Sequence, residues 1–328
     1  MRLLFTFCVL LASTAVYAQE RSVDALPLDA VPQSVLTFGS QISIKLKNGE
    51  VRGYKLAGHE LKSEKPVQPK AEVLPHDALP DAVIGKSNSD IREAWLTRPT
   101  KRYAHGVLGD GIEAGGFKVE TASGEQLEFV LPETEVFEDR YARVVDLEGD
   151  GRAEVVVVNS HADLGAALAV FGIRDGKLVR IARTPFIGTA NRWLNPAAIA
   201  DFDGNSVKEI AIVVTPHIGG NLQFWELDGK ALKLAAEIRG FSNHFIGSRV
   251  QEMSVVLKNT KTGALEVILP SADRRSLKSV SLANGKAVIN WQLELPARVT
   301  TEIVAVPGDK KSPTLVMGLS DKTVISVH

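Results

Sequence analysis

The chain has 328 residues, of which 45% are hydrophobic and 23% charged, and its formal net charge at pH 7 is −1. This composition is typical of a folded globular protein and excludes a largely disordered chain. The balanced charge gives no electrostatic reason to expect nucleic acid or an anionic membrane surface as a partner.

The start of the chain, residues 1–18, has the features of a secretory signal peptide. Arg2 is followed by an apolar stretch over residues 3–12 and by small residues around a cleavage site at residues 16–18, which is the usual order of such a peptide. The only cysteine, Cys8, lies inside the apolar stretch, so the exported chain would have no disulfide and no lipid-anchor thiol. Export without disulfides favours a bacterial cell envelope, with a periplasmic or secreted protein. No other stretch is long enough to span a membrane, so we predict no transmembrane segment.

The next segment, residues 19–80, contains six prolines and is predicted to be mostly linker. Its exception is an alternation of apolar and polar residues on both sides of Asn48-Gly49. This pattern indicates a β-hairpin, because Asn-Gly supplies the positive φ angles of a tight turn. A lone hairpin is only marginally stable. We therefore predict that the hairpin region, residues 35–56, pairs with a sheet elsewhere in the chain.

From about residue 81 the chain is a succession of short apolar strands separated by turns rich in Gly, Asn and Asp. The absence of helical periodicity predicts an all-β protein. Two units share one plan, and their acidic loops begin at Asp146 and Asp201, one repeat apart. The four predicted strands are residues 141–145, 155–159, 167–173 and 178–183 in the first unit, and residues 197–200, 210–214, 222–227 and 232–238 in the second.

Less regular copies of the unit lie on either side. One follows within residues 258–293 and has lost most of its acids, one precedes within residues 93–131, and one with only three strands ends the chain within residues 302–327. Four-stranded units at a period of roughly 40 to 55 residues are typical of propeller blades. We therefore predict a β-propeller over residues 81–328 with five four-stranded blades, or six if the hairpin region builds its own. An N-terminal strand from the hairpin would complete the last unit and close the ring.

The two acidic loops, each with an apolar strand directly after it, resemble the FG-GAP or VCBS repeats of integrin-like β-propellers and many exported bacterial proteins. The resemblance covers residues 81–328, and its clearest part is residues 137–250. Residues 103–110, 184–194 and 241–247 are also similar to exported proteobacterial proteins of this class that have no assigned activity. The resemblance therefore implies a fold and a metal ion, and it implies no reaction.

In that family the loop Asp-x-Asp-x-Asp-Gly-x-x-Asp binds calcium through the side chains at positions one, three, five and nine and the carbonyl at position seven. The resemblance thus implies two structural calcium sites. Departures from the pattern, such as Glu148, Asn205, Ser206 and the terminal glutamates, bear on affinity rather than on the existence of the sites. The implied ligands are Asp146, Glu148, Asp150, Glu154 and the carbonyl of Arg152 in the first loop, and Asp201, Asp203, Asn205, Glu209 and the carbonyl of Val207 in the second.

The chemistry of the loops agrees with a hard cation. Calcium takes six to eight oxygen ligands, and clustered carboxylates without a cation would repel one another. An EF-hand would need a glutamate at position twelve, where the two loops have Val157 and Ile212 inside the following strands, so the loops are strand-to-strand turns. Two solvated acidic turns without a metal are the alternative.

Polar side chains recur in the loops one strand further on. His161, His217 and Asp273 occupy equivalent places in three successive units, and His105 matches them in the unit before. Propeller symmetry would bring such loops to one rim, where histidines could ligate a transition metal or bind a ligand. Ordinary polar loops account for the same pattern without a site.

Two arginines and a tryptophan complete the candidate rim. Arg192 and Arg249 lie nine residues before Asp201 and Lys258, and either could bind an anion bidentately or bond one blade to the next. Trp193, beside Arg192, could stack on a sugar ring or pack between blades.

No sequence motif of a hydrolase, metalloprotease, nucleotide-binding enzyme or cysteine nucleophile is present, and we assign no catalytic residue. We therefore predict an exported, calcium-stabilised β-propeller that acts as a binding or scaffolding module for an unidentified protein or carbohydrate ligand. One alternative is an envelope hydrolase or lyase that uses His105, His161, His217 and Arg192 at one rim. The other is a calcium-dependent lectin.

Overall fold

The structure, a computed structural model, describes residues 21–68, 72–307 and 312–328. The predicted signal peptide, residues 1–18, lies outside these residues. All regular secondary structure in the described ranges is β-strand, and no helix occurs among them. The prediction of an all-β protein is confirmed.

The strands of the described chain form five hydrogen-bonded sheets, and four of these sheets have four strands each. Strand pairing in all of them is antiparallel, as short connections between consecutive strands require. The four sheets are β2 (Pro32–Phe38), β3 (Gln41–Leu46), β4 (Val51–Ala57) and β5 (Glu60–Glu64); β15 (Leu194–Ala200), β16 (Glu209–Val214), β17 (Asn221–Asp228) and β18 (Ala231–Arg239); β19 (Val255–Lys258), β20 (Leu265–Pro270), β21 (Ser276–Ala283) and β22 (Lys286–Glu294); and β23 (Val304–Val306), β24 (Thr314–Gly318) and β25 (Thr323–Val327) with β1 (Val23–Pro27).

The fifth sheet has nine strands because a short strand joins two groups of four. That strand, β10 (Glu135–Phe137), pairs with β12 of one group and with β8 of the other. The first group is β6 (Gly85–Lys86), β7 (Ile91–Thr100), β8 (Glu113–Thr121) and β9 (Gln126–Val130), and the second is β11 (Arg143–Val145), β12 (Glu154–His161), β13 (Gly165–Arg174) and β14 (Lys177–Arg183).

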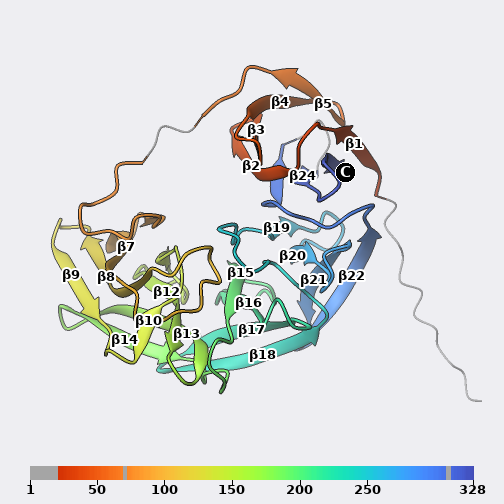
Figure 1. The fold of residues 1–328 in the computed structure, drawn as a ribbon. Helices are drawn as coiled ribbons and strands as arrows, with labels where there is room; N and C mark the ends of the chain where they lie inside the picture. The colour runs from red at the N-terminus through yellow and green to blue at the C-terminus, as the bar shows by residue number, and fades with distance from the viewer. Residues whose placement is uncertain (1–20, 69–71, 308–311) are drawn as a thin grey trace, which may run out of the picture.

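The sheets follow one another around a ring in chain order (Figure 1). In Figure 1, β15 and β19 lie toward the middle of the ring, whereas β18 and β22 lie at its outside. Four-stranded antiparallel sheets arranged radially around an axis are the architecture of a β-propeller. The acidic loops connect β11 to β12 and β15 to β16, the first and second strands of their groups.

The N-terminal region differs from its prediction in two respects. The hairpin region, residues 35–56, does not pair with the last three strands, because β2 to β5 form a sheet of their own. The strand that pairs with β25 is β1, in register from Val23 opposite Val327 to Pro27 opposite Thr323. Much of the segment predicted to be linker is therefore strand, with Pro27 at the end of β1 and Pro32 at the start of β2, whereas the described residues between β5 and β6 form no strand.

The core lies between neighbouring sheets, and β12 shows how both faces of a strand are covered. Val155 and Val157 pack in a cluster with residues of β7 and β8, whereas Val156 and Val158 pack in a second cluster with residues of β15 and β16. All four side chains are fully buried, and burying one valine contributes about 1.5 kcal/mol. The uninterrupted apolar run in the sequence reflects this two-sided burial.

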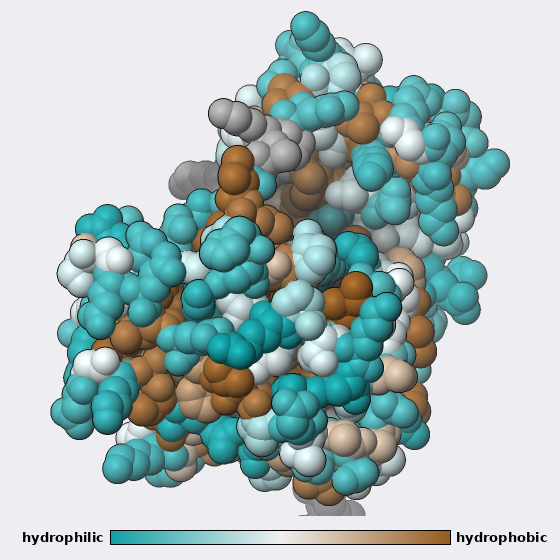
Figure 2. All heavy atoms as spheres, turned by 60° about the vertical axis from the view of Figure 1, so that its left-hand side comes forward, coloured by the Kyte–Doolittle hydropathy of each residue, from teal (hydrophilic) through white to brown (hydrophobic). Residues whose placement is uncertain are grey.

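The described residues contain no helix that is long and apolar enough to cross a membrane. On the face shown in Figure 2, hydrophilic side chains cover most of the surface and hydrophobic residues lie in small groups between them.

Candidate functional site

The two acidic loops share one hydrogen-bonding frame. In the β15–β16 loop, Asp201 Oδ1 accepts hydrogen bonds from the backbone N–H groups of Gly204 at 2.7 Å and Asn205 at 3.1 Å, and Oδ2 accepts from Ser206 at 3.0 Å. In the β11–β12 loop, Asp146 accepts from the same three positions at 2.7, 3.2 and 2.9 Å. The first aspartate of each loop therefore shapes the turn, as aspartate commonly does.

The last glutamate of each loop is buried at the start of the following strand. Glu154 Oε2 accepts the N–H of Leu147 at 3.1 Å, and Glu209 Oε2 accepts the N–H of Phe202 at 2.7 Å. Burial raises the pKa of both carboxyl groups to about 7. Their second oxygens differ, because that of Glu154 lies 3.6 Å from Arg174, whereas that of Glu209 has no hydrogen-bond partner among the described residues.

Only in the second loop do the carboxylates lie close together. Asp201, Asp203 and Glu209 each offer an oxygen within 4.8 Å of the others, and no other group of three His, Cys, Asp or Glu side chains in the described ranges does so. In the first loop, the carboxylate of Asp150 instead pairs with Arg152 at 2.6 Å. An all-oxygen set with an unpaired buried oxygen fits calcium, so the donor set of the second loop suits the predicted ion better.

Two further predicted ligands lie at the surface. Asn205 is exposed, and its Nδ2 donates to Asp203 at 3.2 Å and to Glu226 at 3.0 Å, while its Oδ1 accepts the N–H of Val207 at 2.7 Å. The side chain of Glu148 is exposed. Asn205 is therefore fixed by hydrogen bonds to its own loop, next to the clustered carboxylates.

His105 forms one buried contact of the predicted rim. Its Nδ1 lies 2.6 Å from Oε1 of Glu138, and Ser160 Oγ donates to Oε2 of the same carboxylate at 2.6 Å. Glu138 is fully buried, and desolvation raises the pKa of its carboxyl group. Glu138 follows β10 directly, and nothing in its sequence neighbourhood marked it as the partner of a histidine in the loop after β7.

His217 forms the second contact, with a histidine that the sequence did not single out. His217 Nε2 lies 2.9 Å from Nδ1 of His244, whose Nε2 lies 2.9 Å from the carbonyl oxygen of Ser248. Because a carbonyl only accepts, His244 donates from Nε2, and the neutral ring accepts from His217 at Nδ1. Burial lowers the pKa of His217 to about 4 and that of His244 to about 3, so both rings are neutral at pH 7.

Trp193 packs between these two contacts. Its ring is stacked against His217 at 6.2 Å, and its Nε1 donates to the carbonyl of Glu138 at 2.9 Å. Only 2% of Trp193 is exposed. The indole therefore packs in the core, in agreement with the alternative that it packs between blades, and it leaves no open face for a sugar ring.

Three of the four remaining rim candidates lie apart. His161 Nδ1 accepts the N–H of Asp163 at 3.1 Å, Asp273 accepts from Ser271 Oγ at 2.6 Å, and Arg192 is half-buried. In the part of the chain that the structure describes, no hydrogen bond or ring contact joins any of the three to His105 or His217.

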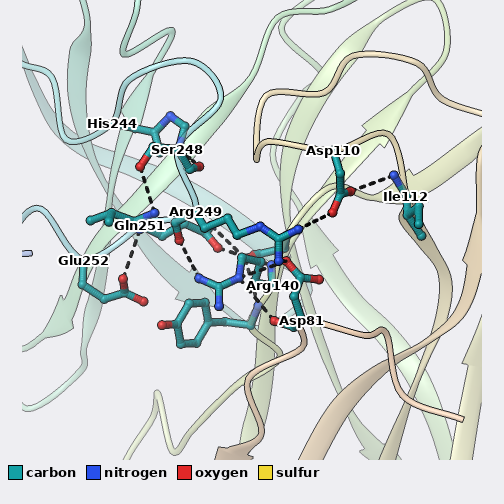
Figure 3. A network of polar contacts seen from close by, with 12 residues as sticks. Asp81, Asp110, Ile112, Arg140, His244, Ser248, Arg249, Gln251 and Glu252 are labelled. Atoms are coloured by element: carbon teal, nitrogen blue, oxygen red, sulfur yellow. Dashed lines mark hydrogen bonds and ion pairs between the residues drawn. The ribbon is translucent and has the colours of Figure 1, made fainter. Parts of the chain in front are cut away.

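Arg249 is bonded to acidic residues of other units (Figure 3). Its guanidinium lies 2.6 Å from Asp110 and 3.1 Å from Asp81. Arg140 approaches the same Asp81 at 3.2 Å and donates to the carbonyl of Arg249. These contacts match the alternative in which a repeated arginine bonds one unit to another.

A buried polar network crosses the middle of the ring. Gln251 Nε2 donates to Asp139 Oδ1 at 3.0 Å and to Asn195 Oδ1 at 3.3 Å, and Asn195 Nδ2 donates to the carbonyl of Gln251 at 2.9 Å. All three side chains are buried. They recur at equal intervals along the chain, a repeat that the sequence contains but that the acidic loops alone did not reveal.

A cleft of about 940 Å³ lies beside this network. It is lined by β2 and β3, by the residues that precede β11, β19 and β23, and by the loops that follow β7 and β20. Two carboxyl groups, Glu252 and Glu302, lie in its wall. Burial, together with the nearby charge of Glu302, raises the pKa of Glu252 to about 7.

Comparisons with known proteins add little to this description. No protein-family model matches the chain, and no curated protein matches it. The chain is similar to a crystal structure of BBS1N in complex with ARL6DN, at 15% identity over 90% of this chain and 78% of that one, with a TM-score of 0.37. This similarity is too low to support an argument, so the architecture rests on the strand pairing above. The resemblance to FG-GAP or VCBS repeats stays a prediction.

Proposed function

We propose that this protein is a binding module, built as a six-bladed β-propeller whose ligand occupies the central cleft. The six blades are β2–β5, β6–β9, β11–β14, β15–β18, β19–β22 and β23–β25 with β1. The cleft carries the proposal, because side chains from well-separated parts of the chain line one cavity of about 940 Å³. This volume lies within the usual range of ligand sites, about 300 to 1,000 Å³.

The residues that line the cleft fit a binding site. None of them is a histidine or a cysteine, and the two histidine contacts, His105 with Glu138 and His217 with His244, are not part of the lining. The lining combines apolar side chains, among them Leu36 and Phe245, with charged ones. Such mixed walls are typical of sites that hold a ligand by shape and charge.

A cleft-filling substitution tests the proposal. Thr37 lines the cleft on β2, so Thr37→Trp should block it, whereas Val130→Trp adds the same ring at an exposed place on β9. We expect members of a mixed glycan and peptide array to bind the unmodified protein and Val130→Trp, and to be lost with Thr37→Trp. Ligands that bind all three proteins equally would place the site elsewhere, and an array without any ligand would argue against a binding module.

We also propose that the chain is of the FG-GAP or VCBS type and binds structural calcium. The support is the oxygen cluster of Asp201, Asp203 and Glu209, together with the unpaired buried oxygen of Glu209. Calcium would neutralise the three carboxylates and pin β15 to β16. The first loop, whose Asp150 pairs with Arg152, would bind it more weakly. Thermal melts with calcium and with a chelator test this proposal.

Export is the third part of the proposal. The support is the sequence of residues 1–18, with its basic start, apolar stretch and small-residue cleavage site. Expression of the full chain in a bacterial host should give a periplasmic or secreted protein that begins at Gln19. Fractionation and mass spectrometry of the N-terminus would show this, and a cytoplasmic protein that retains Met1 would contradict it.

A further inference from the structure

Positive charge is in excess in the cleft, because three of the basic side chains that line it have no carboxylate partner among the described residues. Arg274, Lys45 and Lys47 line the cleft, and none of them makes a salt bridge within the described residues. The two other basic residues of the lining, Arg140 and Arg249, are paired with Asp81 or Asp110. The cleft thus presents positive charge that the described chain does not neutralise.

Arg274 is the most constrained of these cations. Its NH1 donates to the carbonyl of Val299 at 3.1 Å, and its guanidinium lies 4.9 Å from the centre of the Phe245 ring. Its backbone has a φ of 59°, a conformation that few residues other than glycine adopt. Burial lowers the pKa of its guanidinium. An oxyanion bound to the free N–H groups of Arg274 would offset this desolvation and match the fork of the guanidinium.

The carboxyl groups of the cleft do not cancel this charge. The carboxylate of Glu302 accepts hydrogen bonds from Val35 N at 2.8 Å and from Ser34 Oγ at 3.0 Å. Glu252 accepts from Gln251 N at 3.1 Å. Neither forms a salt bridge with Arg274 or the lysines in the described ranges, so these three cations line the cleft without a carboxylate partner there.

The positions of the cations define the shape of the ligand. Arg274 lies in the loop between β20 and β21, whereas Lys45 and Lys47 lie on and just after β3, in a different sheet. The cations stand on two walls of the cleft, so a ligand that pairs with all three of them carries more than one anionic group. Apolar side chains such as Leu36 and Ile303 also line the cleft, which favours a ligand with apolar groups between its charges.

We infer that the cleft binds an acidic peptide segment, in which two or more carboxylates pair with Arg274, Lys45 and Lys47 while apolar side chains contact Leu36 and Phe245. This inference rests on the proposed binding function and specifies the class of its ligand. A peptide satisfies both the charge and the apolar lining, whereas a glycan or a polyphosphate satisfies the charge alone.

Fluorescence anisotropy with two labelled peptides tests the inference. One peptide alternates glutamate with leucine, and the other has glutamine in place of every glutamate. We expect the glutamate peptide to bind at least tenfold more tightly, because charged hydrogen bonds are lost with glutamine. Arg274→Gln should weaken its binding about tenfold, and the double variant Lys45→Gln with Lys47→Gln should do so by a similar factor. Lys177→Gln, an exposed lysine on β14, should have no effect.

The other outcomes separate this inference from the proposed function. Equal binding of both peptides, or unchanged binding by the Lys45 and Lys47 double variant, would overturn the acidic class even if Arg274→Gln failed to fold. Heparin or tripolyphosphate binding more tightly than the glutamate peptide, with the same dependence on the lysines, would assign the cleft to another polyanion. Neutral ligands that are lost with Thr37→Trp would leave the binding function intact and refute the acidic ligand.

Discussion

The carboxylate of Glu302 accepts a hydrogen bond of 2.8 Å from the backbone N–H of Val35, 267 residues away in the chain. Ser34 Oγ donates to the same carboxylate at 3.0 Å, and Thr300 Oγ1 donates to the carbonyl of Pro32 at 3.3 Å. Glu302 precedes β23 and Val35 lies in β2. One partly buried acid thus fastens the first sheet to the last.

Removing this acid should loosen the first sheet. Glu302→Ala leaves Val35 N without its acceptor, and an unsatisfied buried donor costs about 1 to 3 kcal/mol. We expect a loss of that size in the free energy of unfolding measured with urea. Glu294→Ala, at an exposed place on β22, should change it little. Hydrogen exchange should be faster in β2–β5 than elsewhere, and a uniform increase over the chain would contradict the assigned role of Glu302.

The sequence predicted the strands better than their partners. The alternation around Asn48-Gly49 correctly indicated paired strands, and Asn48 and Gly49 lie in the turn between β3 and β4. It could not show that β2 and β5 extend the hairpin into a sheet, because Pro32 and the charged residues of β5 resemble a linker. Strand β1 ends at Pro27, where a short turn leads to Pro32 at the start of β2, and its partner β25 is at the other end of the chain. Local patterns contain no information about such distant pairing.

Some features of the candidate site could be predicted from the sequence and others could not. The turn geometry of Asp146 and Asp201 follows from local spacing, so the loop frames could be predicted. The pairing of His105 with Glu138 depends on how two units meet, and a polar residue beside an inner strand resembles an ordinary loop residue. Trp193 was open to two interpretations because burial, unlike periodicity, is set by the neighbouring unit. The cleft was not predicted, since its walls come from many separate segments.

Stability should depend on pH through Glu113. This buried carboxyl group has its pKa raised to about 10, chiefly by desolvation and then by the charges of Glu138, Asp110, Asp81 and Asp139. It is protonated in the folded protein at pH 7, whereas in the unfolded chain it is ionised above about 4.5. The contribution of Glu113 to the free energy of unfolding is therefore fully present below that pH. It decreases as the pH rises toward 10, by at most about 1.4 kcal/mol per pH unit.

Glu113→Gln isolates this effect, because glutamine resembles the protonated acid. We expect the difference in unfolding free energy between the variant and the unmodified protein to grow in favour of the variant from pH 6 to pH 9. Urea titrations at each pH measure it. A difference that stays constant over this range would show that Glu113 is ionised in the folded state.

Calcium should stabilise the protein through the second acidic loop. Asp203 and Glu148 both occupy the third position of their loops and are both exposed, so Asp203→Ala and Glu148→Ala form a matched pair. We expect calcium at 100 times its dissociation constant to stabilise the unmodified protein by about 2.7 kcal/mol. Asp203→Ala should lose this gain and Glu148→Ala should keep it, as measured by thermal melts against a chelator. Equal losses in both variants would implicate both loops, and no gain in the unmodified protein would refute calcium binding.

The central polar network should contribute to stability as a unit. Gln251→Leu keeps the approximate volume of the side chain but removes the donor to Asp139 and Asn195. It also removes the acceptor of the Arg140 backbone N–H, whose distance to Gln251 Oε1 is 3.3 Å. Because the groups left behind are buried, we expect a loss of about 1 to 3 kcal/mol in the free energy of unfolding.

A double-mutant cycle shows whether Gln251 and Asn195 are coupled. Asn195→Leu alone should cost a similar amount, and the double variant should cost less than the sum of the two, because each substitution leaves the other partner unsatisfied. Gln292→Leu, at an exposed place on β22, is the control for the chemical change. Strict additivity of the two losses would mean that the hydrogen bonds between these side chains contribute nothing to joining their blades across the ring.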